Sequence, residues 1–143
     1  MSSNEGQKPK ILIVDDDVSL TDTLAQGIGD RFDAEILTAY DGLEASEIFD
    51  EVRPEIVILD LMLPKRGGFQ LLQTWKGKDE MKGKLPFVIM ITGNETLRHE
   101  QFAFQNGIDE YLRKPFSVST LIQLIEEYLR KLSEEAPEWA KPQ

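Results

Sequence analysis

Short apolar runs recur along the chain, and they limit the folds open to it more than any other feature. The runs at residues 11–14, 56–59 and 87–91 are unbroken, as in strands that are buried on both faces of a parallel sheet. Weaker runs lie at residues 35–39 and 111–112. Segments with the apolar spacing of helices separate them. This alternation predicts an α/β fold with five βα repeats, a parallel sheet and helices on both of its faces.

The predicted helices differ in how well their sequences favour them. Gly27 and Gly29 are expected to weaken the end of the first helix. Residues 94–106 have a poor apolar stripe, but Gly107 is a good stop signal. The last helix has the clearest stripe, and Ser117 is a candidate N-cap.

Length and composition predict one globular domain. The chain has 143 residues, of which 41% are hydrophobic and 29% charged. We expect a disordered extension at residues 1–8, a domain at residues 9–132, and an acidic tail or the start of a linker at residues 133–143. The absence of cysteine excludes disulfides, thiolate zinc sites and cysteine nucleophiles.

The charge pattern narrows the class of partner. The formal net charge of -10 predicts no direct binding of nucleic acid, because such a chain repels a phosphate backbone. The longest apolar run is far below the roughly 20 residues that span a bilayer, so no membrane partner is expected. Without an apolar signal-peptide core at the N-terminus, the prediction is a cytoplasmic protein.

Polar and charged side chains follow four of the predicted strands. Residues 15–17, all aspartate, follow the first strand, and Asp60 follows the third. Thr92 follows the fourth and Lys114 the fifth. Ligands of open parallel sheets bind beyond the carboxyl ends of the strands, so these groups are expected to share one site. Taken singly, the aspartates could be helix caps, Thr92 a core hydroxyl and Lys114 a solvated charge; their joint placement favours a functional site.

The chemistry of such a site follows from its residue types. Converging carboxylates repel one another, and oxygen ligands without cysteine favour Mg²⁺ or Mn²⁺. An ammonium and a hydroxyl suit a transferred phosphoryl group, which needs charge neutralisation and a hydrogen-bond donor. An aspartate beside the metal can be the nucleophile and form an acyl phosphate.

Four ordered motifs carry a resemblance to a known family. They read Ile-Leu-Ile-Val-Asp-Asp-Asp at residues 11–17, Ile-Val-Ile-Leu-Asp-Leu-Met-Leu-Pro at 56–64, Val-Ile-Met-Ile-Thr-Gly at 88–93 and Tyr-Leu-Arg-Lys-Pro-Phe at 111–116. Together they resemble the receiver domain of bacterial two-component response regulators, over about residues 9–132. The resemblance implies a flavodoxin-like (βα)5 doubly wound parallel sheet with the strand order 2-1-3-4-5.

The resemblance also implies roles for the acidic residues. Asp60 would be the phosphoacceptor, taking a phosphoryl group from a histidine of a sensor kinase or phosphotransfer protein in a phosphorelay. Asp15, Asp16, Asp60 and the backbone carbonyl of Met62 would hold Mg²⁺ (or Mn²⁺). Asp17 would be a bystander that caps the first helix.

Further residues would transmit the signal. Lys114 would pair with the phosphoryl oxygens. Thr92 would form a hydrogen bond with the phosphoryl group and move towards it, and Tyr111 would change rotamer with Thr92. That motion would alter the surface of the fourth helix, fifth strand and fifth helix for a downstream effector or a phosphorylation-dependent homodimer. Three residues would shape the loops around the site: Pro64, Gly68 and Pro115. The protein would be a switch that catalyses only its own phosphorylation and dephosphorylation, not an enzyme acting on other substrates.

Two other readings remain open at this point. A haloacid-dehalogenase-like phosphatase would use Asp15 as nucleophile and Asp17 as general acid, but it leaves Asp60 and Lys114 without roles. A degenerate receiver would only bind proteins, although none of the motif residues is missing. His99, the single histidine, is expected at the surface without a role in phosphotransfer, and Trp75 is expected to pack at the end of the third helix.

Overall fold

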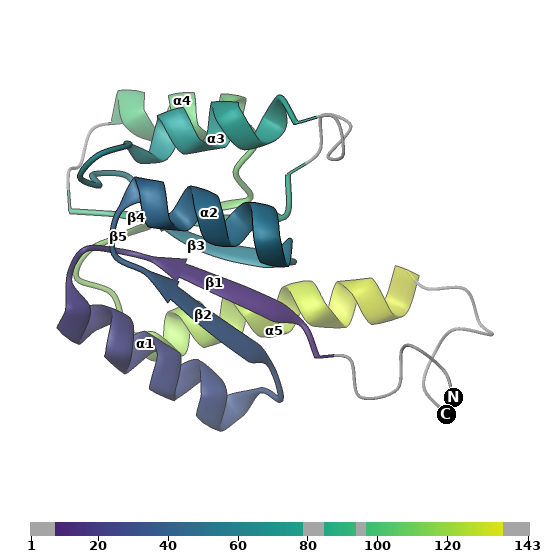
Figure 1. The fold of residues 1–143 in the computed structure, drawn as a ribbon. Helices are drawn as coiled ribbons and strands as arrows, with labels where there is room; N and C mark the ends of the chain where they lie inside the picture. The colour runs from purple at the N-terminus through teal and green to yellow at the C-terminus, as the bar shows by residue number, and fades with distance from the viewer. Residues whose placement is uncertain (1–7, 79–84, 94–96, 136–143) are drawn as a thin grey trace.

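A five-stranded parallel sheet organises the protein, as a computed structural model shows for residues 8–78, 85–93 and 97–135 (Figure 1). The strand order is β2-β1-β3-β4-β5, which confirms the predicted doubly wound fold. Each strand matches its predicted run or extends it by one residue at one or both ends. The strands are β1 (Lys10–Val14), β2 (Glu35–Ala39), β3 (Ile56–Asp60), β4 (Phe87–Thr92) and β5 (Glu110–Arg113).

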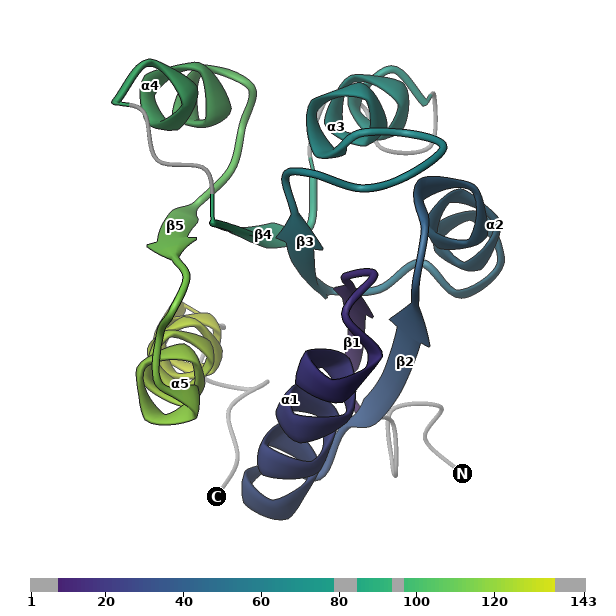
Figure 2. The ribbon, with the colours of Figure 1, turned by 90° about the vertical axis from the view of Figure 1, so that its left-hand side faces the viewer.

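Five helices cover the two faces of the sheet. Helices α1 and α5 lie on one face, and α2, α3 and α4 lie on the other (Figures 1 and 2). Each helix follows one strand along the chain, so the topology is a regular series of βα units. The helices are α1 (Val18–Arg31), α2 (Gly42–Val52), α3 (Gly68–Lys76), α4 (Leu97–Gln105) and α5 (Val118–Glu135).

The central strands supply side chains to two hydrophobic cores. In β1, Leu12 and Val14 pack toward α2 and α3, while Ile11 and Ile13 pack toward α1 and α5. All four side chains are fully buried, which is why the run has no polar alternation. Trp75, at the end of α3, is also buried and stacks on Phe49 of α2 with ring centroids 4.2 Å apart, as expected.

The glycines that are expected to weaken the end of α1 do not interrupt the helix. The helix continues through Gly27 and Gly29 to Arg31. A Cβ atom at Gly27 would lie 2.7 Å from Cγ1 of Val118 in α5. Gly27 therefore lets the two helices approach closely, and this packing compensates for its poor helix propensity.

The chain around α4 and beyond α5 differs in detail from the prediction. Gly107 has φ +98° and follows the end of α4, as predicted, and the next residue, Ile108, is buried in the core. Residues 94–96, expected to begin this helix, lie outside the described residues. Helix α5 continues through residues 133–135, which the prediction assigned to the tail. Of the extension expected at residues 1–8, only residue 8 is among the described residues. The remainder of the tail, residues 136–143, lies outside them.

One side chain is less exposed than predicted. His99 in α4 is half-buried, and its ring lies 6.4 Å from that of Phe69 at the start of α3. The reason is that the apolar contact between α3 and α4 includes this position. Within the described part of the chain, no helix is both long and apolar enough to cross a membrane.

Candidate functional site

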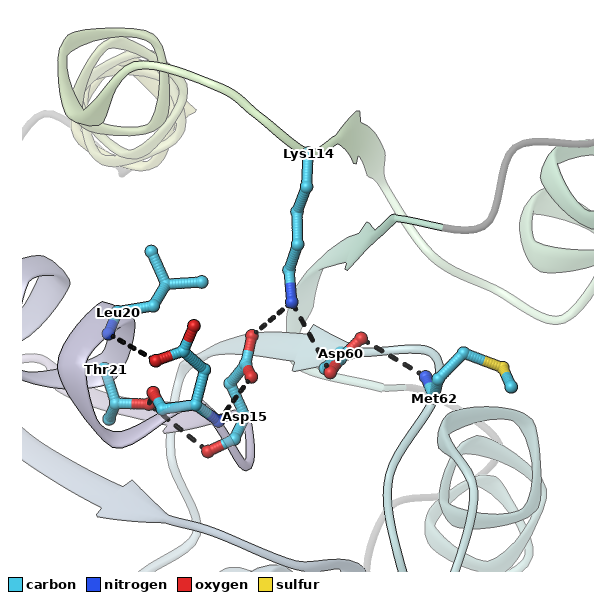
Figure 3. Close-up of polar contacts among 7 residues, drawn as sticks. Asp15, Leu20, Thr21, Asp60, Met62 and Lys114 are labelled. Atoms are coloured by element: carbon cyan, nitrogen blue, oxygen red, sulfur yellow. Dashed lines mark hydrogen bonds and ion pairs between the residues drawn. The ribbon is translucent and has the colours of Figure 1, made fainter.

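Three charged side chains from different strands meet at one edge of the sheet (Figure 3). Asp15 follows β1 directly, and Asp60 is the last residue of β3, the strand that pairs with β1. Lys114 follows β5 and reaches across to both carboxylates. Its Nζ lies 2.8 Å from Oδ2 of Asp15 and 3.6 Å from Oδ2 of Asp60. The expected convergence of strand ends therefore occurs.

Asp15 is held rigidly in this pocket. Its side chain is fully buried, and Oδ1 accepts a hydrogen bond of 2.9 Å from the backbone N–H of Asp17. Its own N–H donates to the carbonyl of Ala39 at the end of β2 (3.1 Å). The hydroxyl of Thr21 in α1 donates to the Asp15 carbonyl at 3.2 Å. Backbone and side chain are thus both fixed before any ligand arrives.

Asp60 has a raised pKa in this pocket. Burial raises its pKa, and the neighbouring charge of Asp15 raises it further; Lys114 only partly offsets these effects, so that the pKa is about 6. Oδ1 of Asp60 accepts a hydrogen bond of 3.2 Å from the backbone N–H of Met62. The carboxylate therefore stands between an ammonium on one oxygen and a backbone amide on the other.

Lys114 remains a cation in this setting. Its burial alone would lower its pKa, but the hydrogen bond with Asp15 and the charge of Asp60 raise the pKa above its ordinary value. Its backbone N–H donates to the carbonyl of Thr92 at 2.8 Å, which joins the ends of β4 and β5. The following bond, Lys114–Pro115, is cis.

The carboxylates suit a hard divalent cation. Asp15, Asp16 and Asp60 each place a carboxylate oxygen within 4.8 Å of the others. Asp16 is exposed, whereas the other two are buried, so the group is open on one side. Carboxylate oxygens are the ligands that Mg²⁺ and Mn²⁺ prefer. The residues present therefore fit the expected metal.

Thr92 and Tyr111 lie on neighbouring strands behind the pocket. Thr92 is fully buried at the end of β4. Tyr111 in β5 is paired in register with Met90 of β4, and its half-buried ring packs against the core shared with α2 and α3. A coupled movement of the two remains a prediction.

The loop after Asp60 is shaped by close backbone contacts. The N–H of Gly68 donates to the carbonyl of Leu61 at 3.0 Å, which closes the loop at its base. A Cβ at Gly68 would lie 2.8 Å from the carbonyl oxygen of Asp60, so a side chain there would displace the end of β3. Pro64 stands at the tip of the same loop, where its carbonyl accepts hydrogen bonds from Gly42 and Arg66.

Asp17 does not share the pocket chemistry. It is the N-cap of α1, and its Oδ1 accepts a hydrogen bond of 3.0 Å from the N–H of Leu20. This confirms the expected capping role.

Two residues that support the site were missed from the sequence. Thr21 is one of the few buried polar side chains, and its signal was a hydroxyl on the apolar face of the first helix. Gly42 contacts the loop after Asp60; its signal was the Asp-Gly pair that begins α2.

The fold and the pocket define a doubly wound α/β protein with a carboxylate–lysine site at the carboxyl edge of its sheet. The family model of the response regulator receiver domain matches residues 11–126. The chain belongs to the response regulator receiver domain family.

Individual relatives agree with this membership. The chain is 32% identical over 133 residues to RpaA of Synechocystis sp., a DNA-binding dual master transcriptional regulator. The match covers 93% of this chain and 54% of RpaA, so the chain spans about half the length of that relative.

Solved structures show the same architecture. A CheY-like receiver domain protein from Methanospirillum hungatei is 26% identical, with a TM-score of 0.78 over 91% of this chain and 100% of that one. The N-terminal domain of an uncharacterized Wolinella succinogenes protein is 30% identical, with a TM-score of 0.77 over 89% of this chain and 99% of that domain.

Proposed function

We propose that this protein is a phosphorylation-activated switch in which Asp60 accepts a phosphoryl group from a histidine of a sensor kinase or phosphotransfer protein. The position of Asp60 carries the proposal. It is buried at the centre of the pocket, between the Lys114 ammonium and the Met62 amide, with Asp15 and Asp16 close enough to share a cation. Because its donor is fed by an ATP-dependent kinase, the reaction belongs in the cytoplasm.

The transfer step is a displacement at phosphorus. A carboxylate oxygen of Asp60 forms the new P–O bond while the P–N bond to the donor histidine breaks, and the electron pair of that bond stays with the imidazole. The product is an acyl phosphate on Asp60, which water later hydrolyses. Lys114, 3.6 Å from Asp60, can follow the phosphoryl oxygens and neutralise them.

The cation would be held by the acidic side of the pocket. Asp15, Asp16, Asp60 and the backbone carbonyl of Met62 would hold Mg²⁺, which supplies charge neutralisation to the phosphoryl oxygens. Asp15 is already fixed by the N–H of Asp17, so little reorganisation is needed on that side.

The readout would begin at Thr92 and Tyr111. Thr92 would donate a hydrogen bond to the phosphoryl group, and the side chain of Tyr111 would change rotamer with it. The surface of α4, β5 and α5 would then bind a downstream effector or a second phosphorylated copy. RpaA is a DNA-binding regulator, but for this domain we propose signalling by protein contact, which its charge of -10 supports.

Acetyl phosphate with Mg²⁺ provides the test. The wild-type protein should gain the mass of one phosphoryl group, measured by intact mass spectrometry, and Asp60→Asn should gain none. The matched control is Asp17→Asn, the same change at a residue that only caps α1, which should be phosphorylated like the wild type. Phosphorylation of the Asp60→Asn variant would refute the assignment.

The same experiment addresses the other readings. A degenerate receiver would leave the wild-type protein unmodified at every Mg²⁺ concentration. A phosphatase with Asp15 as nucleophile would lose its phosphoenzyme in Asp15→Asn and keep it in Asp60→Asn. We expect instead that Asp60→Asn gains no phosphoryl group.

A further inference from the structure

The loop between β3 and α3, residues 61–67, is fastened at its tip as well as at its base. The tip is held by the N-terminus of α2, a neighbour in space that comes earlier in the chain. The N–H of Gly42 donates to the carbonyl of Pro64 at 3.2 Å, and Nζ of Lys65 pairs with Oδ2 of Asp41 at 3.3 Å. With the backbone contact between Gly42 and Arg66, these interactions form what we call the loop clasp.

Gly42 is the part of the loop clasp that no other residue can replace. A Cβ atom there would lie 2.3 Å from the carbonyl oxygen of Arg66 and 2.5 Å from its Cβ. Because the obstacle includes backbone, it cannot be removed by rotating a side chain. Any substitution at Gly42 must therefore push the tip of the loop away from α2. The tip itself is a tight turn in which Lys65 has φ +70° and Arg66 donates to Pro64 at 2.8 Å.

The position of this loop matters for Asp60. Met62 lies in the loop, and its N–H is the hydrogen-bond donor to Oδ1 of the acceptor carboxylate. The end of β2, just before the clasp, also holds the other side of the pocket, because the carbonyl of Ala39 accepts the N–H of Asp15. The turn between β2 and α2 is thus flanked by contacts to both sides of the pocket: Ala39 bonds to Asp15, and Gly42 bonds to the loop that carries Met62.

We propose that Gly42 is a positioning residue for phosphorylation of Asp60. Its missing side chain lets the loop clasp form, and the loop clasp fixes where Met62 stands beside the acceptor. The inference rests on the proposed function, because it concerns the cation and the phosphoryl group of the same pocket. Gly42 itself touches neither Asp60 nor any group that reacts.

The test compares two glycine substitutions, one in a crowded place and one in an open place. Gly42→Ala forces the clash with Arg66. Gly67→Ala is made in the loop itself, where a Cβ would meet nothing closer than the Leu61 carbonyl oxygen at 3.9 Å. For each variant, the Mg²⁺ concentration that gives half-maximal phosphorylation by acetyl phosphate is measured well below the melting temperature. Mg²⁺ affinity without phosphodonor is measured by calorimetry.

Gly42→Ala should raise the half-saturating Mg²⁺ concentration about tenfold, as loss of the support of a metal ligand does. Gly67→Ala should match the wild type. A mere loss of stability would not move a Mg²⁺ midpoint measured on folded protein. Wild-type Mg²⁺ dependence in folded Gly42→Ala would overturn the inference, and so would an equal shift in Gly67→Ala.

If Gly42→Ala does not fold, Asp41→Asn provides a second test of the loop clasp. Asparagine keeps the N-cap of α2, whose bond from the Glu44 N–H is 2.8 Å, but it removes the charge that faces Lys65. The midpoint should rise about twofold, the size expected for one exposed ion pair, and an unchanged midpoint would reject the loop clasp. Failure of the wild-type protein to accept a phosphoryl group would instead reject the proposed function.

Discussion

At the scale of single residues, the negative charge of Asp60 is unfavourable in the pocket when no metal cation is bound. Asp60 is 4% exposed and faces the buried carboxylate of Asp15, and one lysine does not neutralise both. Its pKa of about 6 lies above the ordinary value of 3.8, so the folded state binds a proton more readily than the unfolded chain does. Such a group lowers stability at neutral pH and has no effect at a pH below both values.

Asp60→Asn should therefore stabilise the protein without Mg²⁺. At pH 7.5 we expect its free energy of unfolding to exceed that of the wild type by about 2–3 kcal/mol, since each unit of pKa shift corresponds to roughly 1.4 kcal/mol and the shift already includes the attraction of Lys114. The difference should stay constant above pH about 6 and shrink as the pH falls toward 4, as measured by urea unfolding in EDTA. The control is the same Asp→Asn change at Asp22, which is exposed on α1. A gain that does not depend on pH would contradict this account.

At the scale of secondary-structure elements, the contact between α1 and α5 depends on a glycine that helix propensity disfavours. Gly27 faces Val118, whereas Gly29, two residues on, would place a Cβ at an ordinary 3.4 Å from Ile36. The same Gly→Ala change in one helix therefore meets two different surroundings. Comparing the stabilities of the two variants therefore separates the effect of helix propensity from the effect of helix packing.

Gly29→Ala should stabilise the protein by about 0.5–1 kcal/mol, because alanine favours the helix and nothing obstructs it. Gly27→Ala should destabilise it by about 1 kcal/mol, because the stiff valine side chain must move. Thermal and urea unfolding of both variants measure the two effects. Stabilisation by both substitutions would show that the helix contact adjusts freely.

The same elements show how far the sequence could predict the structure. Unbroken apolar runs located three of the strands and weaker runs the other two, and the rule that ligands bind beyond strand ends located Asp15, Asp60 and Lys114. The roles of Gly27 and Gly42 could not be predicted, because each depends on which distant backbone or side chain comes within reach of it. The end of α5 was also missed, since the polar residues 133–135 carry no apolar signal to extend the helix.

At the scale of the whole molecule, cation binding should be linked to folding. The three carboxylates converge only when β1 and β3 are paired, so the unfolded chain offers no equivalent site. A ligand that binds only the folded state adds to its stability in proportion to the logarithm of its concentration.

Mg²⁺ should therefore stabilise the wild-type protein by about 2.7 kcal/mol at roughly one hundred times its measured Kd. At the same Mg²⁺ concentration, Asp16→Asn should lose most of this gain, because it removes one of the three ligands. Asp17→Asn changes the neighbouring residue in the same way and should keep the gain, because its side chain only caps α1. Thermal unfolding with and without Mg²⁺ gives both values, and equal responses of the two variants would exclude the assigned ligand set.

The place of Lys114 on the last strand has a consequence for protein synthesis. Asp15 and Asp60 come early in the chain, but the ammonium that compensates their charge belongs to β5. During translation, the two acidic strands can leave the ribosome and pair before this lysine has been made. In a nascent chain, the charges of Asp15 and Asp60 therefore lack this compensating cation until the fifth strand joins the sheet.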